Sequence, residues 1–337
     1  MPSSVGEVLA PREPRAREGT AFGNETPRHQ RALRHLLNWQ IYVPNKHGSS
    51  SVGPMSHTHQ TEAHHDHQHD RDQAEILELD AEVLAEHIES IAAWLPVTAP
   101  PREIVDLGCG TGTGTFALLD HFPEAHVTAV DSSPGHLQRL REKAQAAGLA
   151  ERVRTVRADL DAAWPELGTP DLVWASASMH HMVDPDRALR RINEILAPGG
   201  LLAVVELAGF PRFLPENAPE ERPGLEERCH AAKERFHAEH VPHRGADWGP
   251  KLTAAGFTVA GERGITVDIE GSRDEAVGRY ALGSLRRLRG GVAETLAAED
   301  LSALDRLLDT EGPDSILRRD DLAVRTERTV WAARSGS

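Results

Sequence analysis

The sequence is poor in cysteine and has no long apolar run. Its 337 residues include only two cysteines, Cys109 and Cys229, which are too few for a disulfide framework or a four-cysteine zinc site. No stretch approaches the roughly 18 apolar residues of a membrane span, and no short apolar run follows a basic N-terminus as in a secretory signal. These absences predict a cytoplasmic protein that does not bind a membrane.

Positive charge is also scarce. Subtracting 52 acidic residues from 37 basic residues gives a net charge of −15. Residues 1–54 hold seven basic and four acidic residues, a local +3, so the rest of the chain carries −18. Such an acidic domain repels nucleic-acid phosphates. We therefore expect a small-molecule or protein substrate and no nucleic-acid partner, and the sequence leaves the oligomeric state open.

Residues 1–73 do not have the pattern of a folded domain. They are rich in Pro, Gly, Ser, Arg and His and show no sustained helical or strand period, which predicts a disordered tail. Met55 is an alternative start of translation. The histidines that follow it (His57, His59, His64, His65, His67 and His69) could chelate a metal ion, but no carboxylate or cysteine frame fixes a geometry. A solvated low-complexity tract is the simpler interpretation, and we predict no structural metal site.

From residue 74 onward the pattern is that of one folded domain, with strands and helices in alternation. Apolar residues from Leu77 to Leu95 fall at helical spacing. Strands are expected at 103–107, 126–131, 153–158, 171–176 and 201–206, and helices between them follow the glycine loop, Pro134 and Pro185. This alternation predicts an α/β fold in which helices cover both faces of a parallel sheet.

The second half departs from strict alternation. Helices are expected at 224–240, 247–255 and, as a pair, within 273–310, and strands at 257–264 and 324–333. Segments of about 209–245 and 271–323 are thus insertions between late strands. We expect them to form a helical lid over the open end of the sheet.

A glycine-rich segment follows the first strand and points to a nucleotide-type ligand. It reads Ile104-Val105-Asp106-Leu107-Gly108-Cys109-Gly110-Thr111-Gly112-Thr113-Gly114. Clustered glycines let the backbone approach a ligand closely at the carboxyl end of a strand. A P-loop is excluded because no Gly-Lys-Ser/Thr follows, and the dinucleotide pattern G-x-G-x-x-G fails from both Gly108 and Gly110.

This segment resembles the first motif of class I S-adenosylmethionine (SAM)-dependent methyltransferases, and the resemblance extends over residues 104–206. It implies a Rossmann-like sheet of seven strands and SAM as the cofactor. It also implies that Asp106 lies beside the methionine part of SAM, while Gly108, Gly110 and Gly112 make room for the cofactor. Cys109 lies in the same loop and belongs to the expected cofactor-binding residues, where we expect it to pack and not to react.

The later motifs of that family are matched in order. Asp131 ends the second strand about 20 residues after the glycines, where a carboxylate can accept both ribose hydroxyls. The resemblance implies that Asp159 accepts a hydrogen bond from the adenine amino group and that the N–H of Leu160 reaches a ring nitrogen. Ser132 and Ser176, at the ends of strands two and four, complete the expected cofactor-binding set.

The chemistry of the cofactor limits what the protein must do. The sulfonium methyl group is already activated, so the protein mainly aligns the acceptor with it and sometimes removes a proton. His180 and His181 after the fourth strand and Glu206 at the end of the fifth are the candidate bases. Further histidines of the lid (His230, His237, His240, His243), with Asp247 and Trp248, could line the acceptor site.

We therefore expect methyl transfer from SAM to a nucleophilic atom of a small molecule. The Asn/Asp-Pro-Pro-aromatic motif of amino-group methyltransferases is absent after strand four, and nothing in the sequence selects the acceptor. Three alternatives stay open: transfer of another part of SAM, a non-catalytic SAM-binding regulatory module, and a metal buffer based on the histidine tract.

Overall fold

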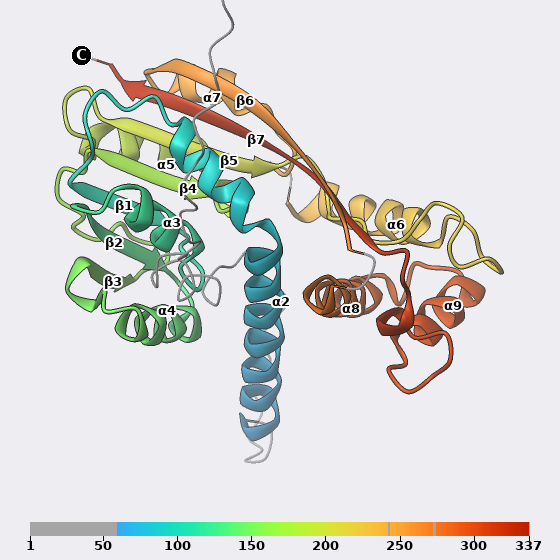
Figure 1. Cartoon of the computed structure of the whole chain (residues 1–337). Coiled ribbons are helices and arrows are strands. Elements are labelled where there is room, and N and C mark those ends of the chain that lie inside the picture. The colour runs from blue at the N-terminus through green and yellow to red at the C-terminus, as the bar shows by residue number, and fades with distance from the viewer. Residues whose placement is uncertain (1–58, 242, 272–273, 337) are drawn as a thin grey trace, which may run out of the picture.

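The computed structural model describes residues 59–241, 243–271 and 274–336 (Figure 1). The strands are β1 (Glu103–Leu107), β2 (His126–Asp131), β3 (Val153–Arg157), β4 (Leu172–Ser176), β5 (Leu201–Leu207), β6 (Phe257–Glu270) and β7 (Ala323–Ser335). The helices are α2 (His59–Trp94), α3 (Thr113–His121), α4 (Pro134–Ala146), α5 (Pro185–Ile195), α6 (Leu225–His240), α7 (Trp248–Ala254), α8 (Glu275–Val292) and α9 (Ala298–Leu308). Short 3₁₀ turns cover Ala150–Arg152, Met179–His181 and Ile316–Arg318.

The strands form one mixed sheet in the order β3-β2-β1-β4-β5-β7-β6. Strands β1 to β5 run parallel to one another, whereas β7 runs antiparallel to both β5 and β6. This confirms the predicted α/β, Rossmann-like, seven-stranded and mostly parallel sheet. The strand order reverses at β1, which lies between β2 and β4, and ligands of such sheets bind outside the carboxyl ends of the strands at that point.

Two hydrophobic cores cover the two faces of the sheet. Successive residues of a strand point to opposite faces, so Ile104 contributes to one core and Val105 to the other. The first core also receives α2, α3 and α8, and the second receives α5 and α7. Because helices cover both faces, every residue of β4 and β5 is buried, as expected for the central strands of a parallel sheet.

Several helices begin at polar caps that can be recognised in the sequence. The side chains of Ser133, Asp184 and Asp274 accept hydrogen bonds from the first turns of α4, α5 and α8. Pro134 and Pro185 occupy the first positions of α4 and α5, where the missing N–H costs nothing. These local signals explain why the predicted helix starts agree with the structure.

Two elements are longer than predicted. Helix α2 begins at His59, within the segment expected to be disordered, and β6 continues to Glu270 instead of ending at residue 264. Figure 1 shows β6 and β7 running together beyond the other strands, with α6, α8 and α9 gathered beside this extension. The inserted helices therefore exist as predicted, but their closure over the sheet as a lid stays a prediction.

None of the helices in the described ranges is long and apolar enough to cross a membrane. Residues 1–58, including His57, lie outside the described residues, and so do the side chains of the remaining tract histidines. The expected disordered tail up to residue 58 and the chelating role of the tract therefore stay predictions.

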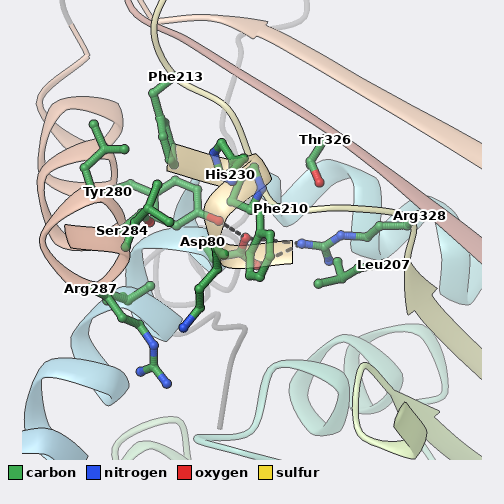
Figure 2. Close-up of a pocket in the computed structure, with 15 residues that line it drawn as sticks. Asp80, Leu207, Phe210, Phe213, His230, Tyr280, Ser284, Arg287, Thr326 and Arg328 are labelled. Carbon is green, nitrogen blue, oxygen red and sulfur yellow. Dashed lines mark hydrogen bonds and ion pairs between the residues drawn. The ribbon is translucent and has the colours of Figure 1, made fainter. Parts of the chain in front are cut away.

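A buried ionic cluster joins three distant parts of the chain. Asp80 of α2 accepts a hydrogen bond from the Tyr280 hydroxyl of α8, and Nη2 of Arg328 on β7 lies 3.0 Å from its Oδ2 (Figure 2). All three side chains are buried. Burial raises the pKa of Asp80, and the Arg328 charge and the Tyr280 hydroxyl oppose this. The cluster fixes α2 against α8 and the antiparallel part of the sheet.

Replacing Asp80 with Asn tests this cluster. The substitution removes the carboxylate that balances the buried charge of Arg328, and losing one partner of a buried ion pair costs about 3–5 kcal/mol. We expect a loss of that size in the free energy of unfolding, measured by urea titration. Glu82→Gln on the same helix is the control, because its contact with Arg279 is exposed and 3.9 Å long, and we expect a loss below about 1 kcal/mol. Equal losses in the two variants would contradict the prediction.

Candidate active site

The glycine loop after β1 adopts a backbone conformation that side chains oppose. Gly108, Gly110 and Gly112 have φ values of +70°, +53° and +103°, which L-residues rarely adopt. A Cβ on Gly108 would lie 2.4 Å from Cβ of Ser178, just after β4. At Gly108 the loop thus lies closer to the end of β4 than a residue with a Cβ could.

Asp106 and Trp174 leave no room for a side chain at Gly114. Asp106 is buried, and its Oδ2 accepts a hydrogen bond from Oγ1 of Thr115 at 2.7 Å. Desolvation, with a further contribution from the negative charge of Asp131, raises the pKa of Asp106 to about 7. A Cβ on Gly114 would lie 2.4 Å from Nε1 of Trp174 and 3.2 Å from Asp106. Sequence reasoning assigned no role to Gly114 or Thr115, although Gly114 is the fourth glycine of the loop.

Asp131 links the end of β2 to the glycine loop. Its Oδ2 accepts a hydrogen bond from the Gly110 N–H at 2.9 Å, and its Oδ1 accepts one from the Ser133 N–H at 2.8 Å. The His136 ring lies 3.4 Å from the same Oδ1. The neighbouring Ser132 is exposed, and its carbonyl oxygen accepts a hydrogen bond from Arg157. The structure therefore brings Asp131, the expected ribose-binding carboxylate, together with the expected cofactor loop.

Asp159 and Leu160 follow β3 at the next strand end. Asp159 is exposed, and its Oδ1 accepts a hydrogen bond from the N–H of Asp161 at 3.0 Å. This is the geometry of an aspartate that stabilises a turn. Leu160 is half-buried against the core on that face of the sheet. Their expected contacts with adenine stay predictions.

Cys109 is a buried packing residue. It contacts the core formed by Ala129, Leu137 and Leu140, and its Sγ lies 3.6 Å from the carbonyl oxygen of Gly110. Burial raises the pKa of its thiol well above the usual range, so the thiolate is disfavoured.

The candidate bases meet at the ends of β4 and β5. Nδ1 of His180 lies 2.5 Å from Oε2 of Glu206, and the backbone N–H of His180 donates to Oε1 at 3.2 Å. Both side chains are almost fully buried, and Nε2 of His180 has no hydrogen-bond partner in the part of the chain that the structure describes. Desolvation lowers the pKa of His180 to about 3 and raises that of Glu206 to about 8. Ser176, also buried, ends β4 just before this pair.

His181 packs against the ring of His180. Its ring centroid is 4.1 Å from that of His180. Burial, His180 and the positive charges of Arg244 and Arg287 lower the pKa of His181, while the negative charge of Asp131 opposes them. The side chain is thus within electrostatic range both of the expected ribose ligand and of arginines from the second half of the chain.

A pocket opens between the sheet and the inserted helices (Figure 2). It encloses about 640 Å³, including the part open to solvent. Its walls come from α2, the segment after β5, α6, α8 and β7: Ile76, Asp80, Leu207, Phe210, Pro211, Phe213, His230, Lys233, Tyr280, Ser284, Leu285, Arg287, Leu288, Thr326 and Arg328. Helix α2 adjoins both sites, because Leu77 faces Gly110 while Ile76 and Asp80 line the pocket.

The polar residues expected in the acceptor site have different positions. His230 lines the pocket and stacks on Phe210 with ring centroids 5.6 Å apart. Trp248 is part of the core beneath the sheet, and Asp247 caps α7. His243 is half-buried and contributes to the low pKa of His180. The side chains of His237 and His240 lie outside the described residues.

The pocket also contains cations that sequence reasoning missed. Lys233 and Arg287 line it, and the guanidinium of Arg244 lies 3.7 Å above the ring of Phe210. These residues come from α6, the α6–α7 connection and α8. No short motif or period relates positions so far apart, so the sequence held no signal for the group.

Comparison with known proteins places the chain among methyltransferases. Residues 104–200 match the family described as "Methyltransferase domain". The trans-aconitate 2-methyltransferase of Methylobacterium nodulans is 31% identical over 201 residues, which are 54% of this chain and 71% of that protein. The malonyl-[acyl-carrier protein] O-methyltransferase of Halorhodospira halophila is 34% identical over 163 residues, 48% of this chain and 50% of that one.

Other matches are shorter or structural. The chain spans only 31% to 49% of the length of five further curated relatives, four of them trans-aconitate 2-methyltransferases. Among solved structures, the [4+2]-cyclase SpnF superimposes with a TM-score of 0.43 at 21% identity, over 75% of this chain and 81% of that one.

The match to the Methylobacterium nodulans protein extends over more than two thirds of that relative. It agrees with the resemblance inferred from the glycine loop and from Asp131, and with the observed strand order. The chain belongs to the class I SAM-dependent methyltransferase family.

Proposed function

We propose that this protein transfers the methyl group of SAM to a nucleophilic atom of a small-molecule acceptor. The observation that carries the proposal is the meeting of the glycine loop and Asp131 at the point where the strand order reverses, with 2.9 Å between the Gly110 nitrogen and Asp131 Oδ2. A nucleoside cofactor needs this combination of a closely approachable backbone and a ribose-binding carboxylate. The relatives named as trans-aconitate and malonyl-[acyl-carrier protein] methyltransferases support methyl transfer.

In this proposal the chain's own residues bind and orient SAM, which supplies an activated methyl group. Gly108, Gly110 and Gly112 accommodate its methionine part beside Asp106. Asp131 accepts the ribose hydroxyls, with two backbone N–H groups already holding its carboxylate in position. Asp159, the N–H of Leu160, Ser132 and Ser176 complete the cofactor site. The insertions at about 209–245 and 271–323 form the acceptor side of a domain that covers residues 74–337.

We further propose that, above about pH 8, His180 accepts the proton when the methyl acceptor must lose one, with Glu206 as its positioning partner and His181 beside it. Below about pH 8 Glu206 is protonated, so its O–H donates to Nδ1 and the ring proton is on Nε2. Above that pH the Glu206 carboxylate accepts the Nδ1–H instead. Nε2 then carries the lone pair that a general base needs.

The cofactor site is tested by replacing Asp131 with Ala. The change removes an anionic hydrogen-bond acceptor, and bonds to charged groups contribute about 1.5–3 kcal/mol. We expect the dissociation constant of SAM, measured by calorimetry on the full chain, to rise by roughly tenfold or more. Asp120→Ala, at the exposed far end of α3, should leave the dissociation constant unchanged.

Binding of NAD in place of SAM would overturn the proposal. SAM binding without turnover of any metabolite would favour the non-catalytic alternative.

The protonation of the His180–Glu206 pair is tested through stability. The folded pKa of Glu206, about 8, lies above its ordinary 4.5, and the folded pKa of His180, about 3, lies below its ordinary 6.5. Glu206 therefore contributes to the free energy of unfolding below pH 4.5, and this contribution is lost as the pH rises through 8. The His180 contribution is present above pH 6.5 and is lost as the pH falls. Between pH 4.5 and 6.5 the two groups change the free energy of unfolding with pH in opposite directions, and their effects cancel. Between pH 6.5 and 8 only Glu206 changes it.

We therefore expect the free energy of unfolding of the wild type, relative to Glu206→Gln, to fall as the pH rises from 6.5 to 8. The slope is at most about 1.4 kcal/mol per pH unit, because one proton is released. Denaturant titrations of both proteins across this range measure it. Parallel curves for the two proteins would show that Glu206 is ionised throughout and would contradict the assignment.

A further inference from the structure

The pocket beside the cofactor edge combines an apolar wall with buried polar atoms. Its apolar wall includes Phe210, Phe213 and Leu285. Within it, the hydroxyl oxygens of Ser284 and Thr326 are buried and find no hydrogen-bond partner among the described residues. Buried polar atoms in native proteins are nearly always paired. An apolar cavity with a few convergent polar groups is the usual form of a small-molecule site.

Two cations line the same pocket, and a third lies over one of its lining residues. Lys233 and Arg287 line it, and Arg244 lies over Phe210, another lining residue. In Figure 2 the guanidinium of Arg287 points away from the Asp80–Arg328 pair, so it does not belong to that cluster. Burial and the positive charges of Arg287 and Arg244 lower the pKa of Lys233 to about 8. Arg244 and Arg287 thus both lie within electrostatic range of Lys233.

Among the described residues, the acidic groups near Arg244 do not contact its guanidinium directly. Glu206 and Glu234 attract Arg244 electrostatically, but the high pKa of Glu206 favours its neutral form. Nη2 of Arg244 donates to the Gly209 carbonyl oxygen at 3.3 Å, and Nη1 is buried with no hydrogen-bond partner within the described ranges. A buried guanidinium is costly unless an anion satisfies it.

The cations also adjoin the cofactor edge. The positive charges of Arg244 and Arg287 lower the pKa of His181, and the negative charge of Asp131 raises it. Arg244 also donates to the carbonyl oxygen of Gly209, two residues after the end of β5, so a molecule bound beside Arg244 lies near that strand end. The pocket provides space for a methyl acceptor, and the positive charge at this end favours an acceptor with a negatively charged group.

We propose that the methyl acceptor is an organic acid with an apolar body. Its carboxylate binds among Lys233, Arg244 and Arg287, and its body packs on Phe210 and Phe213. Arginine matches a carboxylate with two parallel hydrogen bonds, which gives specificity as well as affinity. The inference rests on the proposed function, because it names the acceptor class of the same enzyme.

The test compares acids with neutral molecules of the same shape. Full-length protein saturated with S-adenosylhomocysteine is titrated, by ligand-observed NMR, with benzoate, phenylacetate, 3-phenylpropanoate and hexanoate and with the amide of each. We expect at least one acid to bind roughly tenfold more tightly than its amide. Arg244→Gln should abolish this preference, and Arg244→Lys, which keeps the charge, should retain part of it.

Arg286→Gln is the matched control, because Arg286 is an exposed arginine beside Arg287 on α8 that does not line the pocket. It should leave the preference for acids unchanged. Equal binding of acids and amides, no binding of any acid at millimolar concentration, or a preference that survives Arg244→Gln would overturn the inference. SAM affinity is measured separately. Wild-type protein that fails to bind SAM contradicts the proposed function, whereas SAM binding without a preference for acids contradicts only this inference.

Discussion

The structure depends on one constraint of parallel sheets: their strands end at the same edge. β1, β2, β4 and β5 all point their carboxyl ends to one side. Residues that are far apart in the chain, such as Asp131 and Glu206, are thereby gathered along one line. The glycine loop can lie on this line only because residues without a Cβ permit its contact with Ser178.

Buried ionisable groups then determine how the rest of the molecule joins this edge. The Asp80–Arg328 pair holds α2 between the glycine loop and the pocket. The His180–Glu206 pair, at the ends of adjacent strands, carries its proton on the carboxyl group near neutral pH. Loss of either partner of the Asp80–Arg328 pair leaves the other buried without its partner, which is costly, and the His180–Glu206 hydrogen bond satisfies two buried polar groups. The two clusters therefore couple the assembly of the site to the assembly of the fold.

The pocket differs from the cofactor edge in its origin. The cofactor edge is made by residues 106–206, which form the alternating half that the relatives share. The pocket is made largely by the inserted helices and the long β6–β7 ribbon. The proposed cofactor site and the proposed acceptor site are thus built by different parts of the fold.

The sequence by itself determined most of the elements and the glycine loop. Strands with apolar runs, caps such as Asp184 and the glycines after β1 are local features, so neighbouring residues suffice to reveal them. Only the tertiary structure decided which side chains meet. Asp80 and Arg328 are 248 positions apart, and Lys233, Arg244 and Arg287 share no period. Contacts of this kind arise from the packing of whole elements. Pairing with β7 along its whole length likewise extends β6 to Glu270, beyond its expected end.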